Sequence, residues 1–98
     1  MHTVSAIFTF KPGKKQEFLD ILNGPDGLAV TRACEGFVSI DLYQSTEDEN
    51  TLVAWQKWQS QENHTAYLNL RKESGLFTKL EEMLAEPLAI THLTSLSA

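Results

Sequence analysis

The chain has 98 residues, 42% of them hydrophobic and 21% charged, a composition typical of one small globular domain rather than a disordered segment. Eight basic and thirteen acidic side chains give a formal charge of -5, which argues against a nucleic-acid partner because phosphate binding needs clustered Lys and Arg. The single cysteine excludes an internal disulfide, and the sequence contains neither a stretch apolar enough to cross a bilayer nor the apolar run of a signal peptide. We therefore expect one domain over residues 1–98, located in the cytoplasm, with no membrane partner.

The first third of the chain predicts a strand followed by helix. Residues 3–10 alternate apolar and polar side chains, which is typical of a strand with two unlike faces, and a Lys-Pro-Gly turn ends it. Apolar residues at helical spacing predict a helix over residues 14–23. After a Gly-Pro interruption, Asp26 is a candidate cap for a second helical piece that ends at residue 33 or 34.

Two strands follow, joined by a short acidic connection. Gly36 permits the reversal into a strand over residues 37–44, and a segment rich in Val and Trp predicts the third strand over residues 51–59. Ser60 is the expected N-cap of a helix from Gln61 to about Lys72, because its hydroxyl can accept a hydrogen bond from a free backbone donor.

The last third completes the element order. A Ser-Gly pair breaks the helix, and a further helical piece with a clear apolar stripe reaches Ala85. Residues 88–96 form the last predicted strand. The order βαββαβ predicts an α+β, ferredoxin-like fold, in which a four-stranded antiparallel sheet carries the helices on one face.

The face of the sheet without helices is too apolar to be left in water. It should carry Ile7, Tyr43 and at least one tryptophan. Pairing with a second copy of the chain would cover it. We therefore expect a homodimer whose two sheets pack face to face as an α/β barrel, each subunit keeping a small polar and aromatic cavity.

Several short pieces occur in a fixed order along the sequence. They are Lys11-Pro12-Gly13-Lys14 after the first strand, Thr31-Arg32 and Glu35-Gly36 before the second, and Trp58-Gln59-Ser60 with His64 after the third. In this order and spacing, the chain resembles the antibiotic biosynthesis monooxygenase (ABM) family over about residues 4–93. The resemblance implies a dimeric α/β barrel with a cavity between sheet and helices, closed partly by the second subunit. It also implies one of several activities, among them cofactor-independent oxygenation of aromatic polyketides or quinols, haem degradation, and an isomerase-like reaction on a sugar phosphate.

Trp58 matches the tryptophan that lines this cavity in the oxygenase and haem-degrading relatives, although a core or interface position is the alternative. If it faces the cavity, strand alternation places Gln56 and Ala54 on the same side and puts Val53 and Trp55 under the helices. Quinol-oxidising relatives have asparagine where this chain has Ala54, and many relatives have glutamate where it has Gln56. Haem-degrading relatives have a histidine near the position of Leu68, which this chain lacks.

Four further side chains are candidate ligand contacts. His64 could accept a phenolic proton, or could be a structural histidine bonded to the sheet or to the second subunit. Asp41 and Tyr43 alternate on the second strand and could offer a carboxylate and a phenol to the cavity, or form an exposed pair. Arg32 could bind an anionic or carbonyl oxygen of a ligand, or pair with a neighbouring carboxylate such as Glu35 or Asp41.

These residues support three functional hypotheses. The first is a monooxygenase without metal or flavin that acts on a small aromatic or quinol-like molecule, with Trp58 as wall, His64 as proton acceptor, and Tyr43, Asp41 or Gln56 as orienting partners. The second is a protein that binds such a molecule without turnover, as a sensor or scavenger. The third, a sugar-phosphate isomerase, would need several cations in the cavity, and only Arg32, Lys57 and Arg71 are candidates. No cofactor is expected, and no metal, because no two histidines have the spacing of a helix-borne metal pair.

Overall fold

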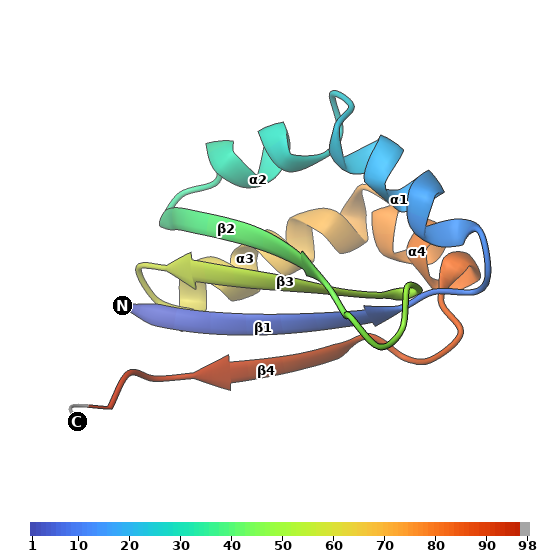
Figure 1. The fold of residues 1–98 in the computed structure, drawn as a ribbon. Coiled ribbons are helices and arrows are strands. Elements are labelled where there is room, and N and C mark those ends of the chain that lie inside the picture. Colours follow the sequence, from blue (N-terminus) through green and yellow to red (C-terminus); the bar gives the residue numbers. More distant parts are fainter. Residues whose placement is uncertain (97–98) are drawn as a thin grey trace.

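The computed structural model describes residues 1–96, which form a four-stranded antiparallel sheet and four helices (Figure 1). The elements are β1 (His2–Thr9), α1 (Lys14–Leu22), α2 (Leu28–Ala33), β2 (Phe37–Gln44), β3 (Thr51–Trp58), α3 (Gln61–Glu73), α4 (Leu76–Met83) and β4 (Ala89–Leu93). The strand order is β2-β3-β1-β4, so the first and last strands are neighbours and β1 and β3 lie in the centre. The prediction of a ferredoxin-like βαββαβ fold is confirmed. Each of its two helical segments consists of two successive helices, α1 with α2 and α3 with α4.

The predicted strands agree with the structure except at their ends. β1 stops one residue early, and Phe10 forms only an isolated bridge with Leu84. β4 covers five residues of the nine predicted, because its pairing with β1 ends at Leu93. Gly36 has a φ of 82°, and a Cβ at this position would collide with the side chain of Asn63, so the turn into β2 requires glycine.

The helix caps follow the sequence in one case and not in the other. The hydroxyl of Ser60 accepts a hydrogen bond from the backbone N–H of Asn63 at 3.1 Å, as predicted for the start of α3. The predicted Asp26 cap of α2 is wrong, because the helix begins one residue later, with Gly27 as N-cap and no side-chain bond. A Cβ on Gly27 would overlap the carbonyl of Leu22. The backbone at the start of α2 therefore packs against the end of α1 more closely than any residue but glycine permits.

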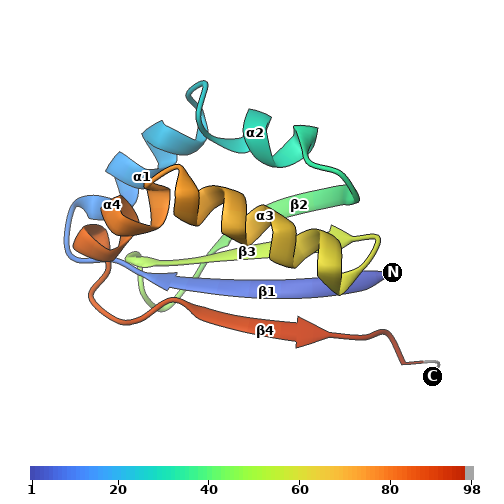
Figure 2. The ribbon, with the colours of Figure 1, turned by 180° about the vertical axis from the view of Figure 1, so that it is seen from behind.

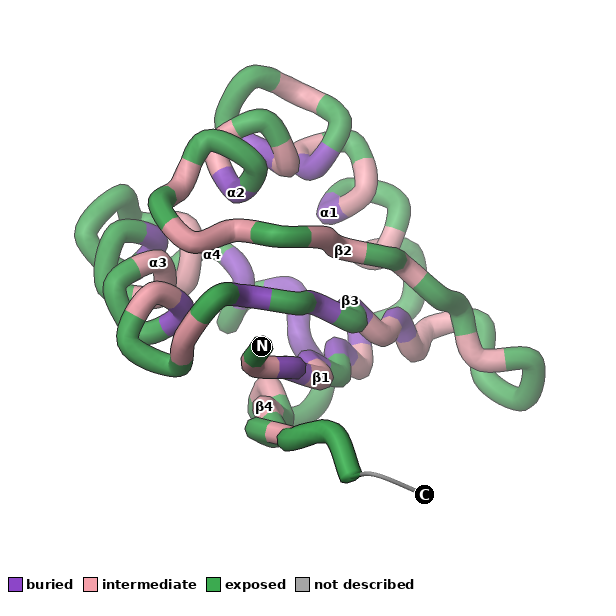
Figure 3. Tube along the Cα trace, turned by 90° about the vertical axis from the view of Figure 1, so that its left-hand side faces the viewer, coloured by how far each residue is buried: buried purple, intermediate pink, exposed green. Residues whose placement is uncertain are grey.

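The two faces of the sheet have different surroundings. All four helices lie on one side, as the two opposite views show (Figures 1 and 2). The buried strand positions lie on the central strands, whereas β2 and β4 carry half-buried and exposed residues (Figure 3). The core therefore lies between the central strands and the helices, where the buried residues are Ala6, Phe8, Phe10, Phe18, Leu22, Leu52, Ala54, Leu80, Met83 and Leu84.

The helix-free face carries an apolar row across three strands. Ile7 is paired with Val53, and Val53 with Tyr43, so the three side chains lie side by side. Trp55 lies on the same face and is 37% exposed, and Tyr43 is 57% exposed. The prediction that Ile7, Tyr43 and a tryptophan share this face is confirmed. The tryptophan is Trp55, however, and the expectation that Val53 and Trp55 lie under the helices is wrong.

Candidate active site

A cavity of about 60 Å³ lies between the sheet and the helices. Its walls are mostly apolar, but five polar side chains from β3, α2 and α3 also line it: Thr31, Gln56, His64, Tyr67 and Arg71. An apolar lining with a few polar groups is typical of a ligand site, although the volume of this hollow is well below the ~300 Å³ at which such sites usually begin. The cavity lies on the helix-covered side of the sheet, in agreement with the cavity between sheet and helices that the family resemblance implies.

Arg71 is the one charged residue that lines this cavity, and it is 4% exposed. Its guanidinium donates to the backbone oxygens of Asp26 (2.7 Å) and Gly27 (2.8 Å), to Thr31 Oγ1 (2.9 Å), and to Tyr67 Oη (3.0 Å). Among residues 1–96 no carboxylate forms an ion pair with it. Neutral oxygens therefore solvate the cation without cancelling its charge, which favours an anion in the cavity.

We call the five polar side chains that line the cavity, Thr31, Gln56, His64, Tyr67 and Arg71, the polar wall. Thr31 and Tyr67 connect Arg71 to its other members. Thr31 Oγ1 lies 2.9 Å from Tyr67 Oη, within hydrogen-bond distance, and Thr31 itself is fully buried on α2. The ring of Tyr67 lies 5.2 Å from the Arg71 guanidinium carbon and 5.1 Å from the ring centre of Trp58. The helix α3 thus presents His64, Tyr67 and Arg71 to the cavity at i, i+3 and i+7, the spacing of one helical face.

His64 is 1% exposed, and its Nδ1 atom is buried without a hydrogen-bond partner. Burial, together with the nearby positive charge that His92 and His2 can carry, lowers the pKa of His64 to about 4. The ring packs edge-on against Trp58 (5.7 Å between centroids) and His92 (5.5 Å). At pH 7 the imidazole is therefore neutral, with one nitrogen that no side chain of the described residues satisfies.

Gln56 and Trp58 form the β3 part of the site. The indole Nε1–H of Trp58 donates to Gln56 Oε1 at 2.9 Å, which turns the NH₂ group of Gln56 away from the indole. Trp58 is completely buried and lies behind Gln56, His64 and Tyr67 rather than on the cavity surface. It packs edge-on against Phe37 at 5.4 Å. Trp58 thus occupies the core position that was the alternative to a cavity wall, and its indole supports the polar side chains from behind.

The other predicted contacts lie away from this cavity. Asp41 and Tyr43 are paired with Trp55 and Val53 on the helix-free face, so they cannot reach the cavity through the sheet, and this expectation is corrected. Arg32 is exposed on α2, and within residues 1–96 it forms neither of the expected ion pairs, with Glu35 or with Asp41. The spacing of His64, Tyr67 and Arg71 along the sequence is that of one helical face, but spacing alone does not show that α2 covers them. Thr31 has a sequence signal only as part of the Thr31-Arg32 piece of the family resemblance, which gives it no role of its own.

Two histidines meet beside this wall. His2 and His92 lie on the adjacent strands β1 and β4, and His2 Nε2 is 2.8 Å from His92 Nδ1. Residues 1–96 contain no group of three His, Cys, Asp or Glu side chains arranged to hold a metal ion. In the same range, no helix is both long and apolar enough to span a bilayer.

The fold and cavity define a small ferredoxin-like protein with a candidate ligand site under its helices. Two comparisons identify its family: the antibiotic biosynthesis monooxygenase model matches residues 1–72, and "Putative monooxygenase YcnE" of Bacillus subtilis (strain 168) is 31% identical over 95 residues, which cover 92% of this chain and 93% of that protein. The chain belongs to the antibiotic biosynthesis monooxygenase family.

Solved structures share the fold. A protein described as an antibiotic biosynthesis monooxygenase superimposes with a TM-score of 0.83 at 15% identity, covering 99% of this chain and 100% of that one. The monooxygenase from the gene ActVA-Orf6 of Streptomyces coelicolor, in complex with the ligand nanaomycin D, has a TM-score of 0.79 at 19% identity, covering 99% and 88%. At these identities the likeness concerns the fold alone.

Proposed function

We propose that this protein is a monooxygenase that oxidises a small, electron-rich phenol or quinol in the cavity between sheet and helices, without metal or flavin. The observation that carries the proposal is the polar wall, in which one buried cation without a counter-anion and one neutral histidine face the same apolar space. Family membership supports an oxygenation reaction. The Streptomyces coelicolor monooxygenase in complex with nanaomycin D gives a precedent for a bound ligand in a protein of this fold.

The chemistry asks little of the protein beyond binding and proton transfer. A phenol that has lost its proton can donate an electron to dioxygen, and the two radicals combine into a carbon–oxygen bond. Loss of water from the resulting hydroperoxide leaves a quinone, so that one oxygen atom enters the product and the other leaves as water. The site must therefore hold the ring, take its proton and exclude bulk water.

The residues of the polar wall suit these tasks. His64 is neutral at pH 7, so it can accept the phenolic proton, and a phenolate formed beside it would raise its pKa again by charge attraction. Arg71 stabilises the phenolate by its charge without giving up its own hydrogen bonds. The NH₂ group of Gln56 can orient a ligand oxygen, and Trp58 fixes this amide. Asp41, Tyr43 and Arg32 have no part in this proposal.

The second candidate is a protein that binds the same ligand without turnover. The specific observation in its favour is the low basicity of His64, because a base with a pKa of about 4 is a weak acceptor for a phenolic proton. Ala54, on the same face of β3, adds neither a donor nor an acceptor. For the sugar-phosphate isomerase, only Arg71 of the three candidate cations lines the cavity, since Arg32 and Lys57 are exposed.

Oxygen uptake distinguishes the two candidates. The purified protein is mixed with a naphthol or an anthrone in an oxygen electrode, and ligand binding is measured in parallel by calorimetry under nitrogen. We expect uptake with the native chain, a loss of about a hundredfold or more in His64→Leu, as for removal of a general base, and no change in Tyr43→Phe, which alters the opposite face. Binding without uptake would assign the non-catalytic function, and neither binding nor uptake would refute both.

We also propose that the helix-free face joins two copies of the chain in a homodimer. The support is the row formed by Ile7, Val53 and Tyr43 beside the exposed indole of Trp55. Replacing Trp55 by glutamate would bury a charge in this interface, so Trp55→Glu should sediment as a monomer at micromolar concentration while the native chain sediments as a dimer. Glu47→Lys, on the acidic β2–β3 connection, is the matched control that leaves the dimer intact. A native chain that sediments as a monomer would contradict the proposal.

A further inference from the structure

The cavity under the helices is too small for the ligand that its polar wall suits. Its volume is about 60 Å³, whereas a cavity of ~150 Å³ binds one benzene ring. An aromatic ligand can therefore enter only if part of the wall moves. The location of the mobile side chains determines the route by which substrates enter and the largest substrate that can pass.

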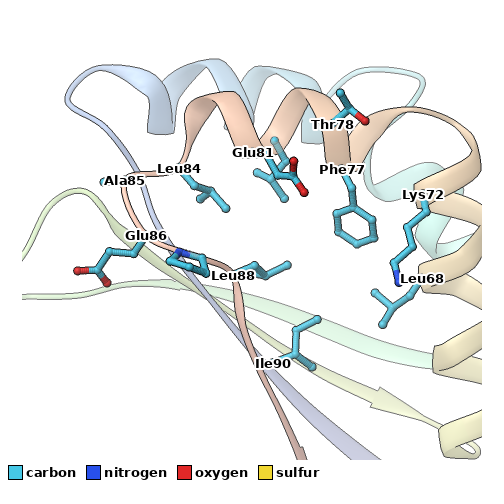
Figure 4. A pocket seen from close by; sticks show the side chains of 12 residues that line it. Leu68, Lys72, Phe77, Thr78, Glu81, Leu84, Ala85, Glu86, Leu88 and Ile90 are labelled. Carbon is cyan, nitrogen blue, oxygen red and sulfur yellow. The ribbon is translucent and has the colours of Figure 1, made fainter.

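One side of the cavity is separated from solvent by a single layer of side chains. A surface groove of about 790 Å³ runs between α3, α4 and the segment leading into β4 (Figure 4). Five residues line both this groove and the inner cavity: Leu68, Phe77, Leu80, Leu88 and Ile90. Since the same side chains face both spaces, moving one of them joins the groove to the cavity.

Phe77 is the member of this layer best placed to move. Leu80 is buried in the core, whereas Phe77, Leu68, Leu88 and Ile90 are half-buried. Phe77 carries the largest of these side chains and lies on the first turn of α4. Its ring projects from α4 into the hollow, toward the strand that carries Ile90 (Figure 4). The helix itself is anchored at its far end, where Met83 O accepts from the backbone of Lys11 at 2.9 Å. The ring can therefore turn about its side-chain bonds while the helix stays in place.

A second surface hollow approaches the cavity from the opposite side, beside α1 and α2, but the connection between this hollow and the cavity is blocked. It has a volume of about 610 Å³ and shares only Arg71 and Leu76 with the cavity lining. Arg71 is fixed by four hydrogen bonds, so opening this side would break the network that solvates its charge. The groove at Phe77 requires only the rotation of an apolar ring.

We propose that aromatic substrates enter the cavity through the groove between α3, α4 and β4, and that Phe77 is the gate. The inference rests on the proposed function in one respect, namely that an aromatic molecule occupies the cavity. The gate limits both the rate of entrance and the size of the ring system that passes. A smaller side chain at this position should therefore admit larger substrates.

Labelling of a thiol placed inside the cavity tests the gate without knowledge of the natural substrate. Cys34→Ser removes the single native thiol, and Ala54→Cys introduces one on the cavity floor. The probe is dithiodipyridine, a neutral aromatic disulfide. The introduced thiolate attacks it to form a mixed disulfide and releases thiopyridone, whose absorbance gives the rate. Phe77→Ala opens the proposed gate, and Leu76→Ala is the matched control, because Leu76 lines the cavity from the opposite side.

If the native ring leaves the passage open about a tenth of the time, labelling should be about tenfold faster in Phe77→Ala and unchanged in Leu76→Ala. Equal rates in both variants, or a larger effect of Leu76→Ala, would overturn the gate. Phe77→Val and Leu76→Val repeat the comparison with smaller cavities in case an alanine variant does not fold. Urea titrations of each variant show whether global unfolding accounts for its labelling rate.

A second arm separates this proposal from the proposed function. Labelling is repeated with saturating naphthol, which should protect the introduced thiol if aromatic molecules occupy the cavity. Absence of protection would count against the proposed function, while the ratio of labelling rates between Phe77→Ala and Leu76→Ala would still decide the route of entrance.

Discussion

Burial of His64 should make the protein lose stability in mild acid. Its pKa is about 4 in the folded chain, against 6.5 for an unburied histidine, so the unfolded chain takes up this proton at a higher pH. Above pH 6.5 both states are neutral at this position, and the free energy of unfolding is at its full value. As the pH falls from 6.5 toward 4, the unfolded state gains a proton that the folded state lacks, and stability is lost at about 1.4 kcal/mol per pH unit. Between pH 7.5 and 4.5 the loss is about 2 to 3 kcal/mol.

Urea denaturation followed by circular dichroism at pH 7.5, 6.0, 5.25 and 4.5 measures this loss. His64→Leu should remove it, because leucine fills a similar space and cannot take up a proton. At pH 7.5 the variant should be about as stable as the native chain, since it removes a buried nitrogen that has no partner. The carboxylates are common to both chains, so their contribution cancels in the difference. His2→Gln, which removes the half-buried member of the histidine pair, should keep most of the acid dependence, because burial is the main cause of the low pKa of His64. Parallel losses in the native chain and His64→Leu would refute the argument that burial suppresses protonation of this ring.

Three further outcomes follow from the same structure. Arg71→Lys should cost about 2 kcal/mol in urea denaturation, because one ammonium cannot reach all the acceptors of the guanidinium, and a cost within error of zero would show that the network is not coupled to folding. Ser60→Ala should cost about 1 kcal/mol through the lost helix cap, whereas Ser74→Ala, at the exposed end of the same helix, should cost less than about 0.5 kcal/mol. If the protein turns over a phenol, kcat/KM should fall in acid with a midpoint near pH 4, where His64 becomes charged, and a midpoint near 6.5 would contradict this assignment.

The fold could be read from the sequence because its signals are local. Alternation along residues 3–10 and the hydroxyl of Ser60 each depend on a few neighbouring residues, and both predictions hold to within a residue. The Asp26 cap fails for a reason that is not local. At this point the backbone of Gly27 lies against the end of α1, and a contact between two segments, rather than a side-chain bond, sets the start of the helix.

The site was harder to predict, because alternation divides the residues of a strand into two sets without saying which set is covered. Gln56 and Trp58 were placed correctly on one side together, but the side was assigned to a dimer interface rather than to the helices. The same uncertainty placed Asp41 and Tyr43 at the cavity. The apolar side chains of β1, such as that of Phe8, lie on the same face of the sheet as Gln56 and Trp58. Only the pairing register of β1 with β3 shows this.

The electrostatics of the cavity limit the class of ligand more than its shape does. His64 is neutral at pH 7 because charging it is unfavourable, whereas Arg71 stays charged because four oxygens solvate it. A cationic ligand would be repelled by the guanidinium, and a strong acid would enter as an anion and pay for its dehydration in the apolar groove. A weak acid avoids both costs, since it can pass Phe77 as a neutral molecule and lose its proton only beside the polar wall. Phenols and quinols have this property, and for this reason a cavity with one cation and one neutral base suits them better than it suits sugar phosphates.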